Sequence, residues 1–206
     1  MKVFSLGGSV LTENLDLLEE YAAAFNDLDE QVVVVTGAGE LKKYIDAVSG
    51  NHAERDLVGI KATRLNAAAL ATEAGAYPEV PETVDELRKA VEQREDVYMG
   101  GLTPGYSTDA VAAIAAELFD AELFITSDVA GVYDREPEEP GAELLEEVTV
   151  KQLRQLSSGN EAGGHSLVDS TALELMERSH IETYFLYGLP ENLAEPKENA
   201  GTALRY

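Results

Sequence analysis

The sequence predicts an α/β protein: a single domain over residues 1–206, built as a three-layer αβα sandwich around a mostly parallel central sheet. Two observations support this predicted fold class. Strand-like and helix-like stretches alternate along the whole chain, which is typical of parallel sheets with helices on both faces. The run QVVVVT at 31–36 is almost continuously apolar, as expected for a strand covered on both faces. Ligands of such sheets bind at the carboxyl ends of the strands.

The N-terminal half contains three predicted strands and their helices. Residues 2–6 form a short apolar strand that runs into two glycines, where a helix begins. Apolar residues at helical spacing predict a helix over 14–28, with Asn14 as its cap. The remaining elements of this half are a strand at 31–36, helices at 40–50, 54–75 and 82–95, and a strand from 96.

The C-terminal half continues the alternation. A helix at 107–120 is opened by Ser107 or Thr108, and Asp169 is expected to cap a second helix at 169–179. Residues 201–206 are expected to form a final edge strand. The other predicted elements are a strand from 121, a Pro/Gly-rich loop at 136–143, a helix at 149–156 and a strand at 181–188.

Composition excludes several classes of function. The chain has 39 acidic and 15 basic residues, a net charge of −24, so its surface should repel nucleic acid and anionic membranes. The acidic residues are dispersed between apolar positions, which favours a folded protein adapted to high salt. No cysteine is present, which excludes disulfides and thiolate metal sites. With no long apolar run and no secretion signal, we expect a cytoplasmic protein.

Four predicted strands end in glycine-rich loops of similar chemistry: LGGS at 6–9, TGAG at 36–39, MGGLTPGYST at 99–108 and TSDVAGVY at 126–133. Each loop alone is explained by a tight turn, since glycine tolerates unusual backbone angles. Four loops along one sheet edge favour binding of anionic groups by backbone N–H groups. The P-loop and dinucleotide-binding fingerprints are both missing from the sequence.

Six stretches, in this order, resemble one known family: GGSVL, VVVTGAGELKKYI, DLVGIKATRLNA, MGGLTPGYSTDAVAA, SDVAGVYDREP and VDSTALELMERSHI. The chain is similar to the amino acid kinase superfamily, most closely to uridylate (UMP) kinases of the archaeal type. The resemblance covers nearly the whole chain. It implies ATP with Mg²⁺, UMP as acceptor, and a homohexamer built from dimers.

The resemblance also implies two sets of binding residues, without a metal ligand among the side chains. Asp56 would accept hydrogen bonds from the UMP ribose, and the loop at 102–108 would wrap the uracil. The UMP set is Ala38, Asp56, Leu102, Thr103, Pro104, Gly105, Tyr106, Ser107 and Thr108. The ATP set is Gly7, Gly8, Ser9, Gly39, Lys43, Ser127, Asp128, Tyr133 and Glu136.

The chain departs from the family's pattern at several positions. Ala38 replaces a glycine, Ala130 an aspartate and Lys43 an arginine, while Ser5 stands where bacterial relatives have lysine. The catalytic cations are therefore predicted to be Lys43 and Arg64. A third candidate, Lys61, is equally well explained as a solvated helix residue. The histidines at 52, 165 and 180 lack metal-ligand spacing and are interpreted as incidental.

The sequence thus predicts a nucleoside monophosphate kinase that transfers phosphate from ATP to UMP. A phosphate acceptor is already ionised, so such a reaction needs positioning and charge neutralisation rather than a general base. Two alternatives remain open. One is another small-molecule kinase on the same fold, acting on a carboxylate or an isoprenoid phosphate. The other is a non-catalytic nucleotide-binding protein for storage or regulation.

Overall fold

The computed structural model describes residues 1–159 and 168–206, with side chains through 156 and from 168 onward. These residues form a seven-stranded sheet in the order β3-β2-β1-β4-β6-β7-β5. Neighbouring strands are parallel except for the antiparallel pair β6 and β7. The strands are β1 (Lys2–Leu6), β2 (Val32–Thr36), β3 (Val97–Met99), β4 (Glu122–Ser127), β5 (Glu147–Thr149), β6 (Thr183–Tyr187) and β7 (Thr202–Arg205). The predicted mostly parallel α/β fold is confirmed.

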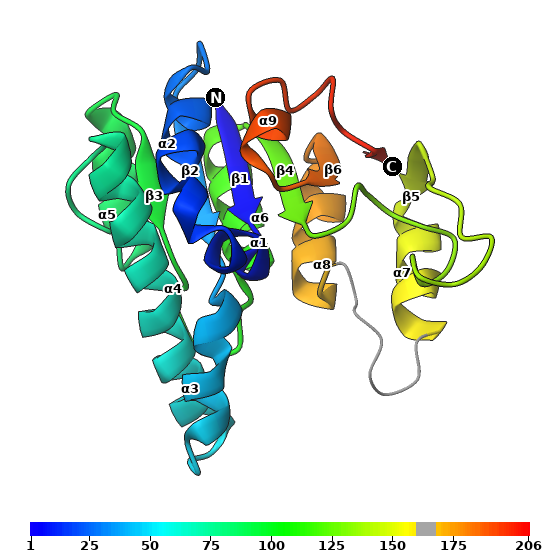
Figure 1. Cartoon of the computed structure of the whole chain (residues 1–206), viewed down its shortest axis with the longest axis horizontal. Coiled ribbons are helices and arrows are strands. Elements are labelled where there is room, and N and C mark those ends of the chain that lie inside the picture. The colour runs from blue at the N-terminus through cyan, green and yellow to red at the C-terminus, as the bar shows by residue number, and fades with distance from the viewer. Residues whose placement is uncertain (160–167) are drawn as a thin grey trace.

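Helices cover both faces of the sheet (Figure 1). The helices are α1 (Gly8–Glu13), α2 (Leu18–Asn26), α3 (Lys42–Ala47), α4 (His52–Ala74), α5 (Val84–Glu92), α6 (Thr108–Phe119), α7 (Val150–Gly159), α8 (Ser170–Ser179) and α9 (Pro190–Leu193), with 3₁₀ turns η1 (Leu15–Leu17) and η2 (Gly39–Leu41). One core cluster joins the sheet to α5, α6, α7 and α8, and the other joins it to α1, α2, α4 and α9. The chain is therefore a three-layer sandwich.

Alternation along the central strands supplies both cores. In β1, Val3 belongs to one cluster while Phe4 and Leu6 belong to the other, because successive side chains of a strand point to opposite faces. Ser5 shares the face of Val3 and is 2% exposed, so a hydroxyl is buried under α6. Helix α6 lies close to this face because its buried residues are mostly alanines.

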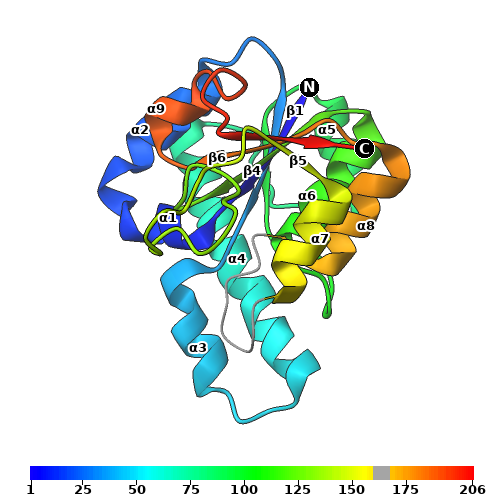
Figure 2. The same ribbon diagram turned by 90° about the vertical axis from the view of Figure 1, so that its right-hand side faces the viewer.

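Helices α3 and α4 form a hairpin that projects beyond the sheet (Figure 2). Helix α4 begins with a capping box, in which Asn51 and Glu54 bond each other's backbone N–H groups. Its 23 residues correspond to about 34 Å at 1.5 Å per residue. One end of α4 packs on the sheet, and the other end pairs with α3 in solvent.

Three details of the sequence prediction are wrong. Strand β7 is not the edge strand, because the short strand β5 pairs with its outer side. Asn14 makes no side-chain cap; its amide donates to the carbonyl of Val10 at 2.7 Å, and η1 precedes α2. Helix α9 was not predicted. A three-residue strand and a four-residue helix are too short to produce a periodic pattern.

Candidate functional site

The four glycine-rich loops lie at one edge of the sheet. They follow β1, β2, β3 and β4, which are neighbours and run parallel. Their carboxyl ends therefore meet at the same edge, where parallel α/β proteins bind ligands. The predicted convergence of the loops is confirmed by this strand order.

Close backbone approach explains the glycines of the first two loops. A Cβ atom on Gly8 would lie 2.6 Å from the nitrogen of Ala38, and one on Gly37 would lie 2.5 Å from the nitrogen of Gly8. Gly39 additionally has a φ of +54°, a conformation that favours glycine. The two loops are thus stacked backbone against backbone, and a side chain at these positions would separate them. Ser9, in the first turn of α1, is exposed.

The loop after β3 is held by polar groups of α4. The Asp56 carboxylate accepts a hydrogen bond from the backbone nitrogen of Gly105 at 2.9 Å. Gly105 has a φ of +86° with open space around its α-carbon. At the start of the loop, Thr63 Oγ1 accepts from the nitrogen of Gly101 at 2.8 Å, and Arg64 Nε donates to the carbonyl of Gly101 at 3.1 Å. Asp56 and the predicted uracil loop are therefore neighbours.

The same helix holds the loop after β2. Asn66 Nδ2 donates to the carbonyl of Gly37 at 2.8 Å, and Thr36 Oγ1 donates to the carbonyl of Thr63 at 2.7 Å. Asn66 and Thr63 are 7% and 6% exposed. Helix α4 thus contacts two of the four loops through buried hydrogen bonds. The sequence motif DLVGIKATRLNA contains both Thr63 and Asn66, but the sequence prediction assigned no role to either residue.

The loop after β4 is held mainly by the segment that leads into β7. The nitrogen of Val132 donates to Thr202 Oγ1 at 2.8 Å, and that hydroxyl donates to the carbonyl of Leu145 at 2.6 Å. A Cβ atom on Gly131 would lie 2.5 Å from Thr202 Oγ1, so the approach is tight. Ser127 Oγ accepts from the nitrogen of Val129. Of the predicted ATP residues on this loop, Asp128 is exposed, whereas Tyr133 and Glu136 are half-buried.

Two part-buried acidic residues, Asp109 and Asp169, connect the loop edge to the helices behind it. Ser5 Oγ donates to Asp109 at 2.5 Å, and Ser107 Oγ donates to Asp169. Burial, with a smaller contribution from the charge of Asp169, raises the pKa of Asp109 to about 6, although the bond from Ser5 opposes the shift. Asp169 caps α8 as predicted, accepting from the nitrogens of Thr171 and Ala172. Sequence reasoning missed the Ser5–Asp109 bond; the only signal was a serine within an apolar strand.

The candidate cations lie in different surroundings. The side chain of Lys43 is 66% exposed and lies 3.9 Å from the Glu40 carboxylate. That of Arg64 is 18% exposed, and its Nη1 pairs with Glu82 at 2.6 Å. Lys61 is exposed. No result tests the predicted catalytic role of Lys43 or Arg64, and both roles stay predictions.

The two histidines within the described residues, His52 and His180, lie in different surroundings. His52 is exposed at the first turn of α4, and the ring of His180 stacks on Tyr206 with centroids 4.9 Å apart. His165 lies outside the described residues. Among residues 1–159 and 168–206, no group of three His, Cys, Asp or Glu side chains could hold a metal ion. None of the helices in these ranges is long and apolar enough to cross a membrane.

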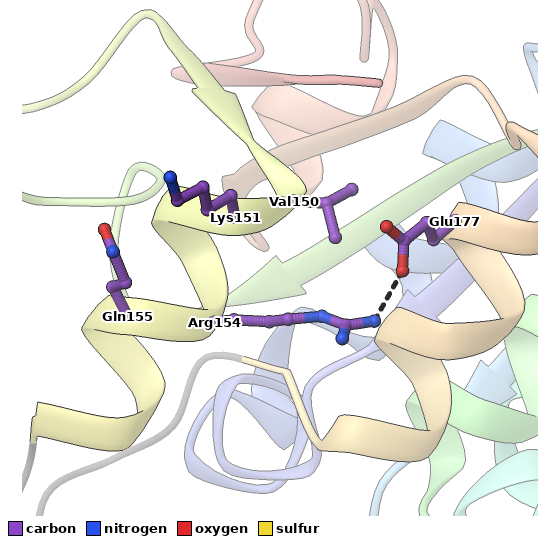
Figure 3. A pocket seen from close by; sticks show the side chains of 5 residues that line it. All are labelled: Val150, Lys151, Arg154, Gln155 and Glu177. Atoms are coloured by element: carbon purple, nitrogen blue, oxygen red, sulfur yellow. Dashed lines mark hydrogen bonds and ion pairs between the residues drawn. The ribbon is translucent and has the colours of Figure 1, made fainter.

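A separate open pocket lies between α7 and α8 (Figure 3). It is lined by Val150, Lys151, Arg154, Gln155 and Glu177. Arg154 forms an ion pair with Glu177 across the two helices. None of these residues belongs to the four glycine-rich loops, so the pocket is not part of the candidate site.

Fold and loops together define a mostly parallel α/β protein with its candidate site at the carboxyl ends of four strands. The sequence model of the amino acid kinase family matches residues 1–186. The chain belongs to this family.

Its relatives include named uridylate kinases. The chain is 40% identical to "Uridylate kinase" of Methanococcoides burtonii, over 94% of this chain and 89% of that protein. It is 43% identical to the one of Methanothrix thermoacetophila, over 90% and 89%. Among solved structures, uridylate kinase from Archaeoglobus fulgidus superposes with a TM-score of 0.89 at 32% identity, covering 99% of each chain. The resemblance inferred from the sequence motifs is confirmed.

Proposed function

We propose that this protein is a UMP kinase that transfers the γ-phosphate of ATP to UMP, giving UDP and ADP. The similarity to uridylate kinases over 94% of the chain carries the proposal. The geometry of the loop edge supports it, because most of the proposed donor and acceptor residues lie on or beside four adjacent loops, while Asp56 and Lys43 lie on α4 and α3. This proposal extends over residues 1–206 as one domain, and it assigns the reaction to the cytoplasm.

The acceptor UMP is assigned to the edge near β3. Asp56 would accept from the ribose hydroxyls, Ala38 would lie beside the phosphate, and the loop from Leu102 to Thr108 would surround the base. Pro104 and Gly105 favour a fixed turn, and Gly105 has the positive φ that such a turn uses. Fixed backbone donors and acceptors discriminate uracil from cytosine, because the wrong base leaves buried polar groups unpaired.

The donor ATP is assigned to the edge near β1 and β4. Gly7, Gly8, Ser9 and Gly39 would contact its phosphates, while Ser127, Asp128, Tyr133 and Glu136 would contact adenine and ribose. Lys43 would neutralise charge between donor and acceptor, since its exposed ammonium is free to move toward a bound nucleotide. An oxygen of the UMP phosphate, already ionised, would attack the γ-phosphorus, so the chain needs no general base.

Magnesium, which we propose arrives with ATP, would neutralise part of the phosphate charge. The described residues offer no three-residue acidic or histidine cluster for it. Magnesium commonly keeps several waters and binds substrate phosphates with few protein ligands. We therefore assign no side chain to the metal and no step of the reaction to a protein–metal contact.

A coupled ADP-release assay tests the function. Purified protein with ATP and Mg²⁺ should turn over UMP, with kcat/KM on the order of a hundredfold above CMP, and should exclude AMP and GMP. EDTA should abolish turnover. Nucleotide binding without turnover, in both low and multimolar salt, would instead support the storage or regulatory alternative. Turnover of a carboxylate or an isoprenoid phosphate in place of UMP would support another kinase of this fold.

Thr108 offers a sharper test of base choice. Thr108→Val removes a hydroxyl from the proposed uracil loop while keeping the side-chain shape. We expect the preference for UMP over CMP to narrow, with the KM for ATP nearly unchanged. If the variant loses ATP affinity instead, the assignment of acceptor and donor sides is wrong.

We further propose that the enzyme is a homohexamer built from dimers. The exposed side of α4 supports self-association: Leu57 and Leu65 are 51% and 61% exposed, and the sequence from 57 to 72 contains no acidic residue. A surface without acidic residues limits the repulsion between two copies of a −24 chain. Light scattering should give a hexamer, and Leu65→Glu should reduce its mass; a monomeric wild type would refute the assembly.

A further inference from the structure

Helix α4 is hydrogen-bonded to two loops that the proposed reaction must keep at a fixed separation. Asn66 donates to the carbonyls of Gly37 and Ala38, at 2.8 and 3.4 Å. Two residues earlier, Arg64 donates to the carbonyl of Gly101 at 3.1 Å. The first loop follows β2 and the second follows β3. A single rigid helix therefore connects the loop proposed to lie beside the UMP phosphate with the loop proposed to surround its base.

The contact between α4 and the loop after β3 is tightly packed. A Cβ atom on Gly100 would lie 2.5 Å from Thr63 Oγ1 and 2.6 Å from the backbone nitrogen of Arg64. Thr63 Oγ1 also accepts from the nitrogen of Gly101, so both backbone groups of Gly101 bond to α4. Protein interiors packed this closely transmit displacements rather than absorb them. Moving α4 side chains should therefore move the start of the loop.

The guanidinium of Arg64 has a protein partner at each of its nitrogens. Its Nε bonds the carbonyl of Gly101, Nη1 pairs with the Glu82 carboxylate at 2.6 Å, and Nη2 donates to the carbonyl of Glu82 at 3.3 Å. Because guanidinium donors lie in one rigid plane, the pair with Glu82 fixes the direction of the bond to Gly101. By contrast, the ion pair that the exposed ammonium of Lys43 makes within the described residues is longer, 3.9 Å to the Glu40 carboxylate.

We propose that Arg64 and Asn66 are positioning residues of α4 that set the acceptor pocket by holding the loops after β3 and β2 in register. Arg64 then acts through Gly101 rather than as a cation on the transferred phosphate. This inference rests on the proposed function for its kinetic readout, since the acceptor is taken to be UMP. It predicts that removing the contacts of the Arg64 guanidinium weakens the binding of UMP far more than the binding of ATP. The rate of the chemical step should stay largely unchanged.

Kinetics of four variants test the proposal. Arg64→Gln should raise the KM for UMP about tenfold, with the KM for ATP within about twofold and kcat within about threefold. Arg64→Lys should fall between wild type and Arg64→Gln, because lysine keeps the charge without the planar fork. Glu82→Gln, at an exposed position that should not affect folding, should give a smaller change in the same direction.

Arg205→Gln is the matched control. Arg205 bonds Glu147 through Nε and Nη2 at 3.0 and 2.7 Å, but this bond joins β7 to β5 at the other end of the sheet. Its kinetics should equal wild type. A kcat that falls a hundredfold or more in Arg64→Gln with an unchanged KM for UMP would overturn the proposal and make Arg64 a catalytic cation. Equal increases of both KM values would also overturn it.

Hydrogen–deuterium exchange tests the positioning role of Arg64 and Asn66 independently of the proposed reaction. Without any nucleotide, peptides covering 97–108 should exchange faster in Arg64→Gln, and peptides covering 32–39 should exchange faster in Asn66→Ala. Peptides from β6 should not change. If wild type fails to phosphorylate UMP but these exchange differences appear, the proposed function fails and the positioning role stands. Unchanged exchange at both loops would refute the positioning role even in an active enzyme.

Discussion

Two loops of the candidate site are held in place by different means. The loop after β3, proposed for UMP, is bonded by Asp56, Thr63 and Arg64, all side chains of α4. The loop after β4, proposed for ATP, is bonded from distant segments by the hydroxyl of Thr202 and by the backbone nitrogen of Leu145, which donates to the carbonyl of Val132. Beside it the backbone of Gly201 lies so close to the carbonyl of Ala130 that no side chain fits.

The two loops are thus held by different parts of the sequence. In the proposed assignment, acceptor recognition would depend on polar side chains gathered within eleven consecutive residues, 56–66. Donor recognition would depend on backbone geometry supported from a segment about seventy residues away along the chain. Substitutions in α4 should therefore act on one nucleotide, and substitutions near Thr202 on the other. The ratio of the KM for UMP to the KM for ATP measures this separation.

Asp56→Ala should produce the largest change. The carboxylate bonds the nitrogen of Gly105 at 2.9 Å and is proposed to bond the UMP ribose as well. Hydrogen bonds to charged groups contribute about 1.5–3 kcal/mol, so the KM for UMP should rise about tenfold or more. The KM for ATP should stay within about twofold, as measured by steady-state kinetics with each substrate varied in turn. An equal rise in both values would show that Asp56 is only structural.

Thr202→Val should move the ratio in the opposite direction. The variant keeps the side-chain shape but removes the acceptor for Val132 and the donor to Leu145. Each buried group left unpaired costs about 1–3 kcal/mol, so urea denaturation should show a lower free energy of unfolding. The KM for ATP should rise severalfold while the KM for UMP changes little. If UMP is affected more, the loop after β4 is not the donor loop.

Asp109→Asn should change the free energy of unfolding without changing the ratio of the two KM values. Burial raises the pKa of Asp109 to about 6, above the value of about 3.9 in unfolded chains. Between these pH values the folded protein binds a proton that the unfolded chain has lost, so wild-type stability falls, relative to the variant, as pH rises from about 4 to 6. The difference is on the order of 2–3 kcal/mol and constant above pH 7. Ser5 can still donate to the asparagine carbonyl.

Urea denaturation of both proteins from pH 4.5 to 7.5 measures this difference directly. Comparing variant with wild type cancels the titration of the other acidic residues, which both proteins share. A stability difference that does not change with pH would contradict the raised pKa of Asp109.

Local sequence signals predicted the fold and the loop edge well. The caps at Ser107 and Asp169 are confirmed, because each bonds backbone nitrogens within three residues. Strand order was not needed to place four glycine-rich loops together, since all parallel strands end at the same edge. Asp56 and Arg64 could be singled out because both belong to one contiguous motif, DLVGIKATRLNA.

Contacts between distant segments could not be predicted in the same way. The bond from Ser5 to Asp109 joins residues 104 apart, and it depends on which face of β1 carries Ser5. The support of Val132 by Thr202 depends on β7 lying between β6 and β5, a position that the sequence prediction had assigned to the sheet edge. Register and strand order are set by packing of the whole sheet, so they cannot be deduced from the sequence of a single segment.

Salt should change stability while leaving the ratio of KM values almost constant. The chain has a net charge of −24, and its self-repulsion is screened as the Debye length falls from about 10 Å at 0.1 M to about 3 Å at 1 M. We therefore expect the melting temperature and the activity to increase between 0.1 and 2 M NaCl, and likewise in KCl. The hydrogen bonds that hold both loops are short contacts to backbone groups, most of them part-buried or buried. Screening of charge by salt should therefore not stabilise one loop more than the other. A melting temperature that is flat or falls over this range would contradict adaptation to salt. A ratio of KM values that changes severalfold would show that long-range charge, rather than these local bonds, distinguishes the two sides of the site.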